Sequence, residues 1–203
     1  MAQANYDRLS PWYDLFAASE RPYREAGLRA LAVQPGEAVL DLGCGTGQVL
    51  PALAQAVGPE GRVAGLDLSP GMCRRARARL GQGSVVCGDA RRLPLAAAAF
   101  DGLLLSFTLE LFSEGEIPLV LRECRRVLRP GGRLAAVALS RVARPGAVAR
   151  LYGRLHHAFP SVIDCRPIPV EQALAGAGFR VRSAQTLFLY RLPVAVVAAV
   201  VSA

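Results

Sequence analysis

Three acidic residues stand where three apolar segments end, and a serine ends a fourth. Asp41, Asp67 and Asp89 follow apolar runs over residues 38–40, 63–66 and 85–87, and Ser106 closes residues 100–105. Runs of this length suit strands that are buried on both faces of a parallel sheet. Ligands bind beyond the carboxyl ends of such strands. We therefore expect these four side chains to lie around one crevice.

A glycine-rich turn follows the first of these strands. Residues 41–47 read Asp-Leu-Gly-Cys-Gly-Thr-Gly, and such glycines let the backbone turn sharply and approach a ligand. A dinucleotide fingerprint would place glycine at position 48, where this chain has Gln48, which disfavours a nicotinamide-dependent oxidoreductase. Pyrophosphate binds at bare helix N-termini and would be repelled by the Asp41 carboxylate. That carboxylate suits a cation, such as the ammonium group of an amino-acid-bearing ligand.

The segment Asp41–Gly47 resembles the first motif of the class I S-adenosylmethionine-dependent methyltransferases. The resemblance implies an α/β fold with a Rossmann-like, doubly wound sheet of seven strands in the order 3-2-1-4-5-7-6. The last strand is then antiparallel, and helices cover both faces. The implied cofactor is S-adenosyl-L-methionine. Its implied binding residues are Tyr13, Asp41, Gly43, Cys44, Gly45, Gly47, Asp67, Leu68, Met72, Asp89, Ala90 and Ser106.

Individual roles follow for the adenosine part of that cofactor. Asp67 comes 20 residues after Gly47, the spacing at which a ribose-binding carboxylate belongs. In the methyltransferases that the chain resembles, the residue matching Asp89 binds the adenine amino group and the next amide, here that of Ala90, binds a ring nitrogen. Met72 packs either on the adenine or in the core.

The N-terminal segment repeats a Tyr-Asp pair seven residues apart, over residues 6–14. It resembles the N-terminal segment of the ubiquinone/menaquinone biosynthesis methyltransferases, of the methyltransferase type 11 group. The resemblance makes residues 1–34 a helical lid with Tyr13 near the reacting groups. The alternative is that the aromatic residues fasten an N-terminal helix to the core. By the same resemblance, residues 141–169 roof the acceptor pocket, and residues 1–203 form a single domain.

A phenol or enol acceptor must lose a proton during methylation, so we looked for a general base. His156 and His157 are candidates because histidine titrates near neutral pH. Adjacent helical residues point about 100° apart, so at most one of them faces the pocket. Glu110 and Tyr13 are alternatives, and the sequence does not choose among the four.

The patterning predicts the remaining elements. Ser69 is expected to cap a helix that starts at Pro70, and Ser113 with Glu116 to form a capping box. The other expected helices cover residues 21–33, 48–57 and 170–177, and the other expected strands cover residues 133–139, 179–189 and 194–201.

The substrate class is narrowed by motifs that the sequence lacks. Residues 105–108 read Leu-Ser-Phe-Thr, without the Asn/Asp-Pro-Pro-aromatic motif of many methyltransferases that act on amino groups of nucleic acids and proteins. No Pro-Cys pair provides the nucleophile for pyrimidine C5 methylation. We expect a small, apolar acceptor, first a quinol-like ring methylated on carbon or oxygen. The alternatives are methylation of a phospholipid headgroup amine, or a protein that binds the cofactor without turnover.

Bulk properties set the remaining expectations. The 203 residues are 52% hydrophobic, which suits one globular α/β domain. The net charge of +8 comes entirely from arginine and favours an anionic partner such as a lipid headgroup layer, with nucleic acid disfavoured. Five dispersed cysteines indicate neither a disulfide framework nor a metal site, and so a reducing cytoplasm. No signal peptide is recognisable, residues 192–203 are too few to span a membrane, and both a monomer and a homodimer remain open.

Overall fold

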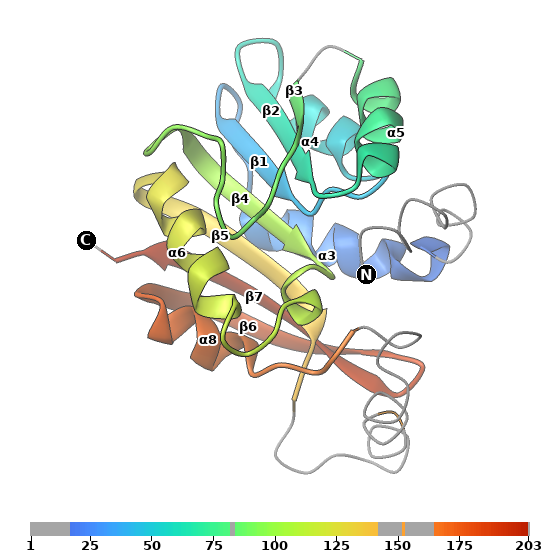
Figure 1. Ribbon diagram of the computed structural model, residues 1–203, viewed down its shortest axis with the longest axis vertical. Coiled ribbons are helices and arrows are strands. Elements are labelled where there is room, and N and C mark those ends of the chain that lie inside the picture. The colour runs from blue at the N-terminus through green and yellow to red at the C-terminus, as the bar shows by residue number, and fades with distance from the viewer. Residues whose placement is uncertain (1–16, 82–83, 142–151, 153–164, 203) are drawn as a thin grey trace.

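The fold is described from a computed structural model, for residues 17–81, 84–141, 152 and 165–202. Seven strands form one sheet in the order β3-β2-β1-β4-β5-β7-β6, which confirms the predicted topology (Figure 1). The first five strands in this order, from β3 to β5, run parallel to one another. Strand β7 runs antiparallel to both of its neighbours, β5 and β6. The strands are β1 (Ala38–Leu42), β2 (Arg62–Asp67), β3 (Ser84–Cys87), β4 (Phe100–Ser106), β5 (Leu128–Leu139), β6 (Phe179–Leu189) and β7 (Leu192–Val201).

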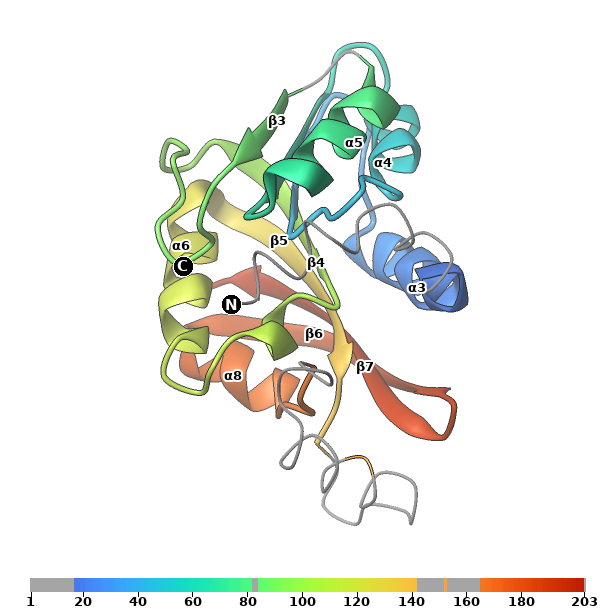
Figure 2. The same cartoon turned by 45° about the vertical axis from the view of Figure 1, so that its right-hand side comes forward.

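Helices cover both faces of the sheet, as expected (Figures 1 and 2). Helices α3, α4 and α5 pack on one face, and α6 and α8 pack on the other. Their bounds are α3 (Arg21–Leu31), α4 (Leu50–Val57), α5 (Pro70–Leu80), α6 (Ile117–Val127) and α8 (Val170–Gly176); two short 3₁₀ helices are η1 (Ala17–Glu20) and η2 (Leu109–Leu111).

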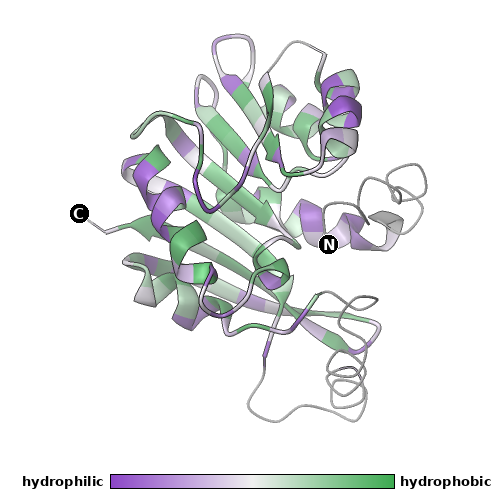
Figure 3. Cartoon of the chain, viewed as in Figure 1, coloured by the Kyte–Doolittle hydropathy of each residue, from purple (hydrophilic) through white to green (hydrophobic). Residues whose placement is uncertain are grey.

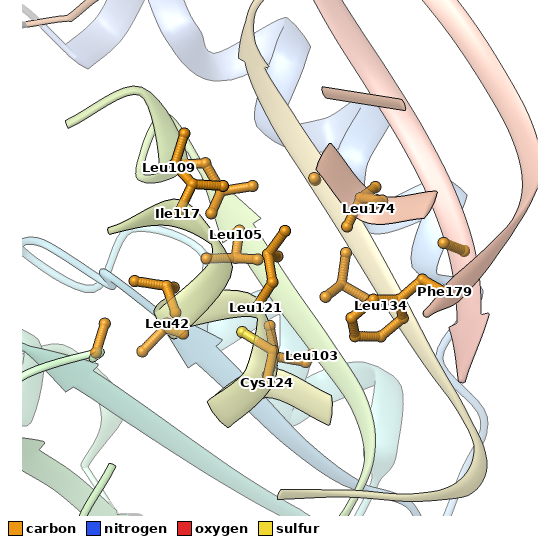
Figure 4. Packing of buried hydrophobic residues seen from close by; sticks show 14 of the residues in the cluster. Leu42, Leu103, Leu105, Leu109, Ile117, Leu121, Cys124, Leu134, Leu174 and Phe179 are labelled. Carbon is orange, nitrogen blue, oxygen red and sulfur yellow. The ribbon is translucent and has the colours of Figure 1, made fainter. Parts of the chain in front are cut away.

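The central strands are apolar on both faces because both faces are covered. Successive strand side chains point to opposite faces, so Leu104 packs with α4 and α5 while its neighbours Leu103 and Leu105 pack with α6 (Figure 4). Figure 3 shows the sheet as a mostly hydrophobic layer and the hydrophilic residues concentrated on the outer sides of the helices. The core therefore holds the strand ends in fixed positions.

The sequence expectations for local structure held at most places and only in part at one helix start. The Ser69 hydroxyl accepts a hydrogen bond from the Met72 amide at 3.1 Å, so the predicted cap of α5 is confirmed. The predicted capping box is half confirmed: the Glu116 carboxylate accepts from the Ser113 amide at 2.9 Å, but α6 begins only at Ile117 and has no side-chain cap of its own. The main-chain carbonyl of Ser113 closes a turn before the helix, accepting from the amides of Glu116 and Ile117.

The tight turn between β6 and β7 uses two large residues with positive φ. Tyr190 has φ 48° and Arg191 has φ 69°, the pattern of a type I′ turn, in which Asn-Gly is usual. A left-handed conformation costs a non-glycine residue on the order of 1–2 kcal/mol. Both central residues of this turn thus adopt a backbone conformation that is unfavourable for residues other than glycine.

Two features are absent from the described residues. None of their helices is both long enough and apolar enough to cross a membrane. They also contain no cluster of three or more histidine, cysteine or acidic side chains that could hold a metal ion.

Candidate functional site

A pocket of about 350 Å³ lies where the carboxyl ends of β1 and β4 meet the start of α3. This volume includes the part of the pocket that is open to solvent. The carboxyl ends coincide because β1 and β4 are parallel neighbours in register, with Asp41 beside Leu104. The pocket is lined by Glu20, Arg24, Asp41, Gly43, Cys44, Gly45, Thr46, Gln48, Val49 and Ser106.

Asp41 is the most unusual group in this pocket. Its side chain is only 2% exposed, and among the described residues no hydrogen-bond partner reaches its Oδ2 atom. Burial raises the pKa of Asp41 to about 7, the Asp67 carboxylate raises it as well, and the Arg24 guanidinium opposes both. A buried carboxylate oxygen without a hydrogen-bond partner favours a bound cation, because the positive charge of the ligand would compensate for the hydration that the carboxylate loses on burial.

Arg24 brings positive charge to the rim of the same pocket. Its guanidinium donates to Glu20 at 3.0 Å, four residues earlier, and to Gln48 of the glycine turn at 2.5 Å. Burial raises the pKa of Glu20, and the ion pair with Arg24 acts in the opposite direction. Sequence analysis missed Glu20, Arg24, Thr46 and Val49, and noted Gln48 only as a departure from the dinucleotide pattern. The four-residue spacing of Glu20 and Arg24 was a visible but weak signal, because it is common on exposed helices.

Ser106 lies at the end of β4, two residues beyond Leu104, the residue that pairs with Asp41. Its hydroxyl is buried, and within the described part of the chain nothing accepts from it or donates to it. The following Thr108 differs, because its hydroxyl lies 3.2 Å from the Leu42 carbonyl and 3.1 Å from the Ser106 carbonyl. The pocket thus contains two buried polar atoms, on Asp41 and Ser106, that suit a polar ligand.

Asp67 has a different environment from Asp41. Its Oδ2 accepts from the Gly45 amide and its Oδ1 accepts from the Ser69 amide, both at 2.9 Å. The side chain therefore joins the glycine turn to the start of α5. The predicted ribose contact remains a prediction.

Two of the glycines are required by packing rather than by the pocket alone. Gly43 has φ +74°, and a Cβ there would lie 2.4 Å from the Thr108 side chain. Gly47 has φ +79°, and a Cβ there would lie 2.8 Å from the Cα of Ala76 on α5. Gly43 lines the pocket and Gly47 does not. Close contact between the turn and α5 therefore also requires glycine at position 47, and its predicted cofactor contact remains a prediction.

The remaining predicted adenosine contacts lie outside the lined pocket. Met72 is 2% exposed, Ala90 is buried and Leu68 is 45% exposed. Asp89 pairs with Arg91 at 2.6 Å, and hydrogen bonds from that guanidinium lower the pKa of the carboxyl. An adenine amino group would have to share Asp89 with Arg91.

The thiol of Cys44 belongs to the pocket wall. It is buried, and burial raises its pKa far above the usual range of a thiol. A thiol that stays protonated is a poor nucleophile. Cys44 therefore contributes packing and a backbone turn rather than chemistry.

The four candidate bases are distributed differently. Glu110 on η2 is 1% exposed, and its Oε1 accepts from the Leu139 amide at 3.0 Å, which ties η2 to the end of β5. It does not line the pocket. Tyr13, His156 and His157 lie outside the described residues, as do residues 1–16 of the proposed lid and most of the proposed insertion. No candidate base is brought to the pocket by the described residues.

Comparison with known proteins gives consistent results. Residues 39–132 match a family described as a methyltransferase domain. A demethylmenaquinone methyltransferase of Listeria welshimeri is 32% identical over 151 residues, which cover 70% of this chain and 63% of that protein. A ubiquinone/menaquinone biosynthesis C-methyltransferase of Bordetella avium is 37% identical over 152 residues, which cover 72% and 57% of the two chains.

Solved structures share the fold. The 1,6-didemethyltoxoflavin-N1-methyltransferase of Burkholderia thailandensis, solved with its substrate and S-adenosylhomocysteine, has a TM-score of 0.74 at 19% identity, covering all of this chain and 88% of that one. The chain spans less than two thirds of the length of either curated relative. The matched domain, the similarity to those relatives and the seven-stranded sheet all support a class I S-adenosylmethionine-dependent methyltransferase.

Proposed function

We propose that this protein transfers a methyl group from S-adenosylmethionine to a small, apolar acceptor. One observation carries the cofactor assignment: Asp41 presents a buried carboxylate oxygen without a described partner to a pocket at the carboxyl ends of β1 and β4. A neutral or anionic ligand would leave that charge unbalanced, whereas the ammonium group of S-adenosylmethionine neutralises it. The matched methyltransferase domain supports the same cofactor.

The residues present fit both ends of this cofactor. Asp41 would hold the ammonium group, and Arg24, at the rim, the carboxylate of the amino-acid part. Asp67 would hold the ribose, and Asp89 with Ala90 the adenine. Bound S-adenosylmethionine supplies an electrophilic methyl group on a sulfonium, so the protein mainly has to orient the acceptor and exclude water.

We propose a quinol-like ring, methylated on carbon or oxygen, as the acceptor. Support comes from the two curated relatives, whose names describe quinone-biosynthesis methyltransferases. On this proposal the chain is a single domain, residues 1–34 close over the cofactor as a lid, and residues 141–169 cover the acceptor. The base remains one of Tyr13, Glu110, His156 and His157.

The proposal is tested by following the labelled methyl group of S-adenosylmethionine into organic-extractable product. The acceptors are a short-chain demethylmenaquinol, phosphatidylethanolamine in vesicles, and buffer alone. We expect transfer to the quinol, and an Asp41→Asn variant should show a large loss of transfer at low cofactor concentration. Glu60→Gln, an exposed change outside the pocket, is the matched control.

Each other outcome contradicts part of the proposal. Transfer to phosphatidylethanolamine alone would replace the quinol by a headgroup amine. Cofactor binding without transfer to either acceptor would indicate a binding protein rather than an enzyme for these substrates. Failure to bind the cofactor at all would overturn the assignment of the pocket.

A further inference from the structure

The β6–β7 hairpin ends in an exposed group of aromatic and basic side chains. Phe188 is 66% exposed and Tyr190 is 76% exposed, although both are large and partly apolar. Arg191 follows in the turn and is exposed as well. We call these three residues the hairpin tip. Figure 2 shows the hairpin projecting beyond the neighbouring strand β5.

The hairpin tip lies at the same edge of the sheet as the pocket. Leu139, the last residue of β5, pairs with Val194 near the start of β7. Because β5 is parallel to β4 and β1, the turn before β7 extends past the carboxyl ends of all three strands. The hairpin tip and the pocket therefore lie at the same end of the molecule.

A side-chain contact links the hairpin tip to the pocket wall. The Tyr23 hydroxyl on α3 donates to the main-chain carbonyl of Phe188 at 2.5 Å. The next residue on α3, Arg24, lines the pocket. The position of the tip is thus tied to the helix that carries the pocket's positive charge.

The charge of the hairpin is one-sided. Residues 179–201 contain three arginines, at positions 180, 182 and 191, and no acidic residue. All three are exposed, but only Arg191 stands at the hairpin tip, because Arg180 pairs with Val200 near the opposite end of the hairpin and Arg182 follows two residues later. Opposite charge is therefore what this surface accepts from a partner.

We propose that the hairpin tip docks on an anionic lipid surface, with Phe188 and Tyr190 entering the headgroup layer and Arg191 contacting phosphate. This rests on the proposed function, because an apolar acceptor is concentrated in lipid and the pocket opens at the same end as the tip. Aromatic side chains combined with arginine are the composition that binds at membrane interfaces. The arrangement would present the pocket to the layer that holds its acceptor.

A second copy of the chain is the weaker occupant of this surface. Two exposed aromatic residues offer much less than the roughly 800 Å² per partner that a stable protein interface buries. A lipid layer needs neither a large area nor shape complementarity.

The test uses a variant in which the turn should fold better than in the natural chain. Tyr190→Asn combined with Arg191→Gly creates the Asn-Gly pair that type I′ turns prefer, and Phe188→Ser removes the remaining aromatic residue. Sedimentation with vesicles of phosphatidylcholine and phosphatidylglycerol measures partitioning of the whole chain. The triple variant should partition at least tenfold more weakly than the natural protein.

The matched control is Leu119→Gln with Arg122→Gln, which removes one exposed apolar and one exposed basic side chain from α6. It should partition as the natural protein does, and vesicles of phosphatidylcholine alone should bind the natural protein several-fold more weakly. Equal partitioning of the triple variant, or no partitioning of the natural protein, would overturn the proposal. So would a dimer of the natural protein that the triple variant abolishes.

Failure of this proposal and failure of the proposed function are separable. Thermal unfolding with S-adenosylmethionine in the absence of lipid reports cofactor binding alone. The triple variant should keep the natural shift. Loss of lipid binding with an intact shift confirms the docking role, whereas a natural protein that lacks the shift refutes the cofactor assignment whatever its behaviour on vesicles.

Discussion

The carboxyl ends of β1 and β2 both carry an aspartate, and the two are used in opposite ways. Asp67 at the end of β2 accepts from two backbone amides and holds the glycine turn against α5. Asp41 at the end of β1 is buried with one oxygen that no described residue contacts, and its pKa is raised to about 7. The aspartate at the end of β2 thus has a structural role, whereas the aspartate at the end of β1 is available to a ligand.

The difference between the two aspartates depends on the turn that follows β1. We expect Gly43→Ala to disrupt this turn more than any other change considered. A Cβ there would meet Thr108 at 2.4 Å, and the residue has φ +74°. We expect a loss of about 2–5 kcal/mol in the free energy of unfolding, from overpacking and left-handed strain together. Urea denaturation measures it.

A matched glycine separates the two causes. Gly36 has φ +84°, and a Cβ there would meet nothing within 4 Å. Gly36→Ala should therefore cost only the left-handed strain, about 1–2 kcal/mol. Equal losses at positions 36 and 43 would show that contact with Thr108 is unimportant.

Asp67→Ala should have the next largest effect on the free energy of unfolding. It removes two charge-assisted hydrogen bonds to backbone amides, and we expect the free energy of unfolding without cofactor to fall by about 2–4 kcal/mol. The measurement is urea denaturation at pH 7. A variant as stable as the natural protein would contradict the structural role given to this carboxylate.

Asp41→Asn should act in the opposite direction on stability. Because the folded pKa of Asp41 is raised, its stabilising contribution is complete below about pH 4 and is lost as the pH rises through about 7. At pH 8 the free energy of unfolding of the variant should thus be about 1–3 kcal/mol higher than that of the natural protein. This difference should become smaller towards pH 5.

Two measurements complete that prediction. Urea denaturation of both proteins at pH 5 and pH 8 gives the pH dependence, and the other titrating groups cancel in the difference. The affinity for S-adenosylmethionine should fall at least tenfold in the variant. A variant that is less stable at pH 8 and binds the cofactor normally would reverse the roles of the two aspartates.

Local sequence patterns were sufficient for the strands and for their order along the chain. Apolar runs ended by Asp41, Asp67 and Ser106 are patterns of single segments, and burial in a parallel sheet produces them directly. The spatial order of the strands came from family resemblance, which carries information about the whole chain. Ser69 was identified as a cap because capping is settled within one turn of helix.

What the sequence could not provide depends on how separate elements meet. Arg24 enters the pocket because the first turns of α3 lie beside the pocket residues of β1 and β4, and no local pattern marks that arrangement. The occupation of both Asp67 oxygens by amides likewise depends on two turns that are 24 residues apart, at Gly45 and Ser69. The capping box at Ser113 forms only in part, because Ser113 and Glu116 close a turn before α6 and do not lie in its first turn.

The central claim is that Asp41 is the vacant acceptor for a cationic cofactor, and calorimetric titration with S-adenosylmethionine tests it most directly. At pH 6.5 Asp41 is mostly protonated, whereas an α-amino group is already charged, so binding should release roughly half a proton or more. Titrations in two buffers of different ionisation enthalpy measure that release. We predict binding with proton release in the natural protein and none in Asp41→Asn; binding with equal heats in both buffers, or binding of NAD instead, would contradict the account.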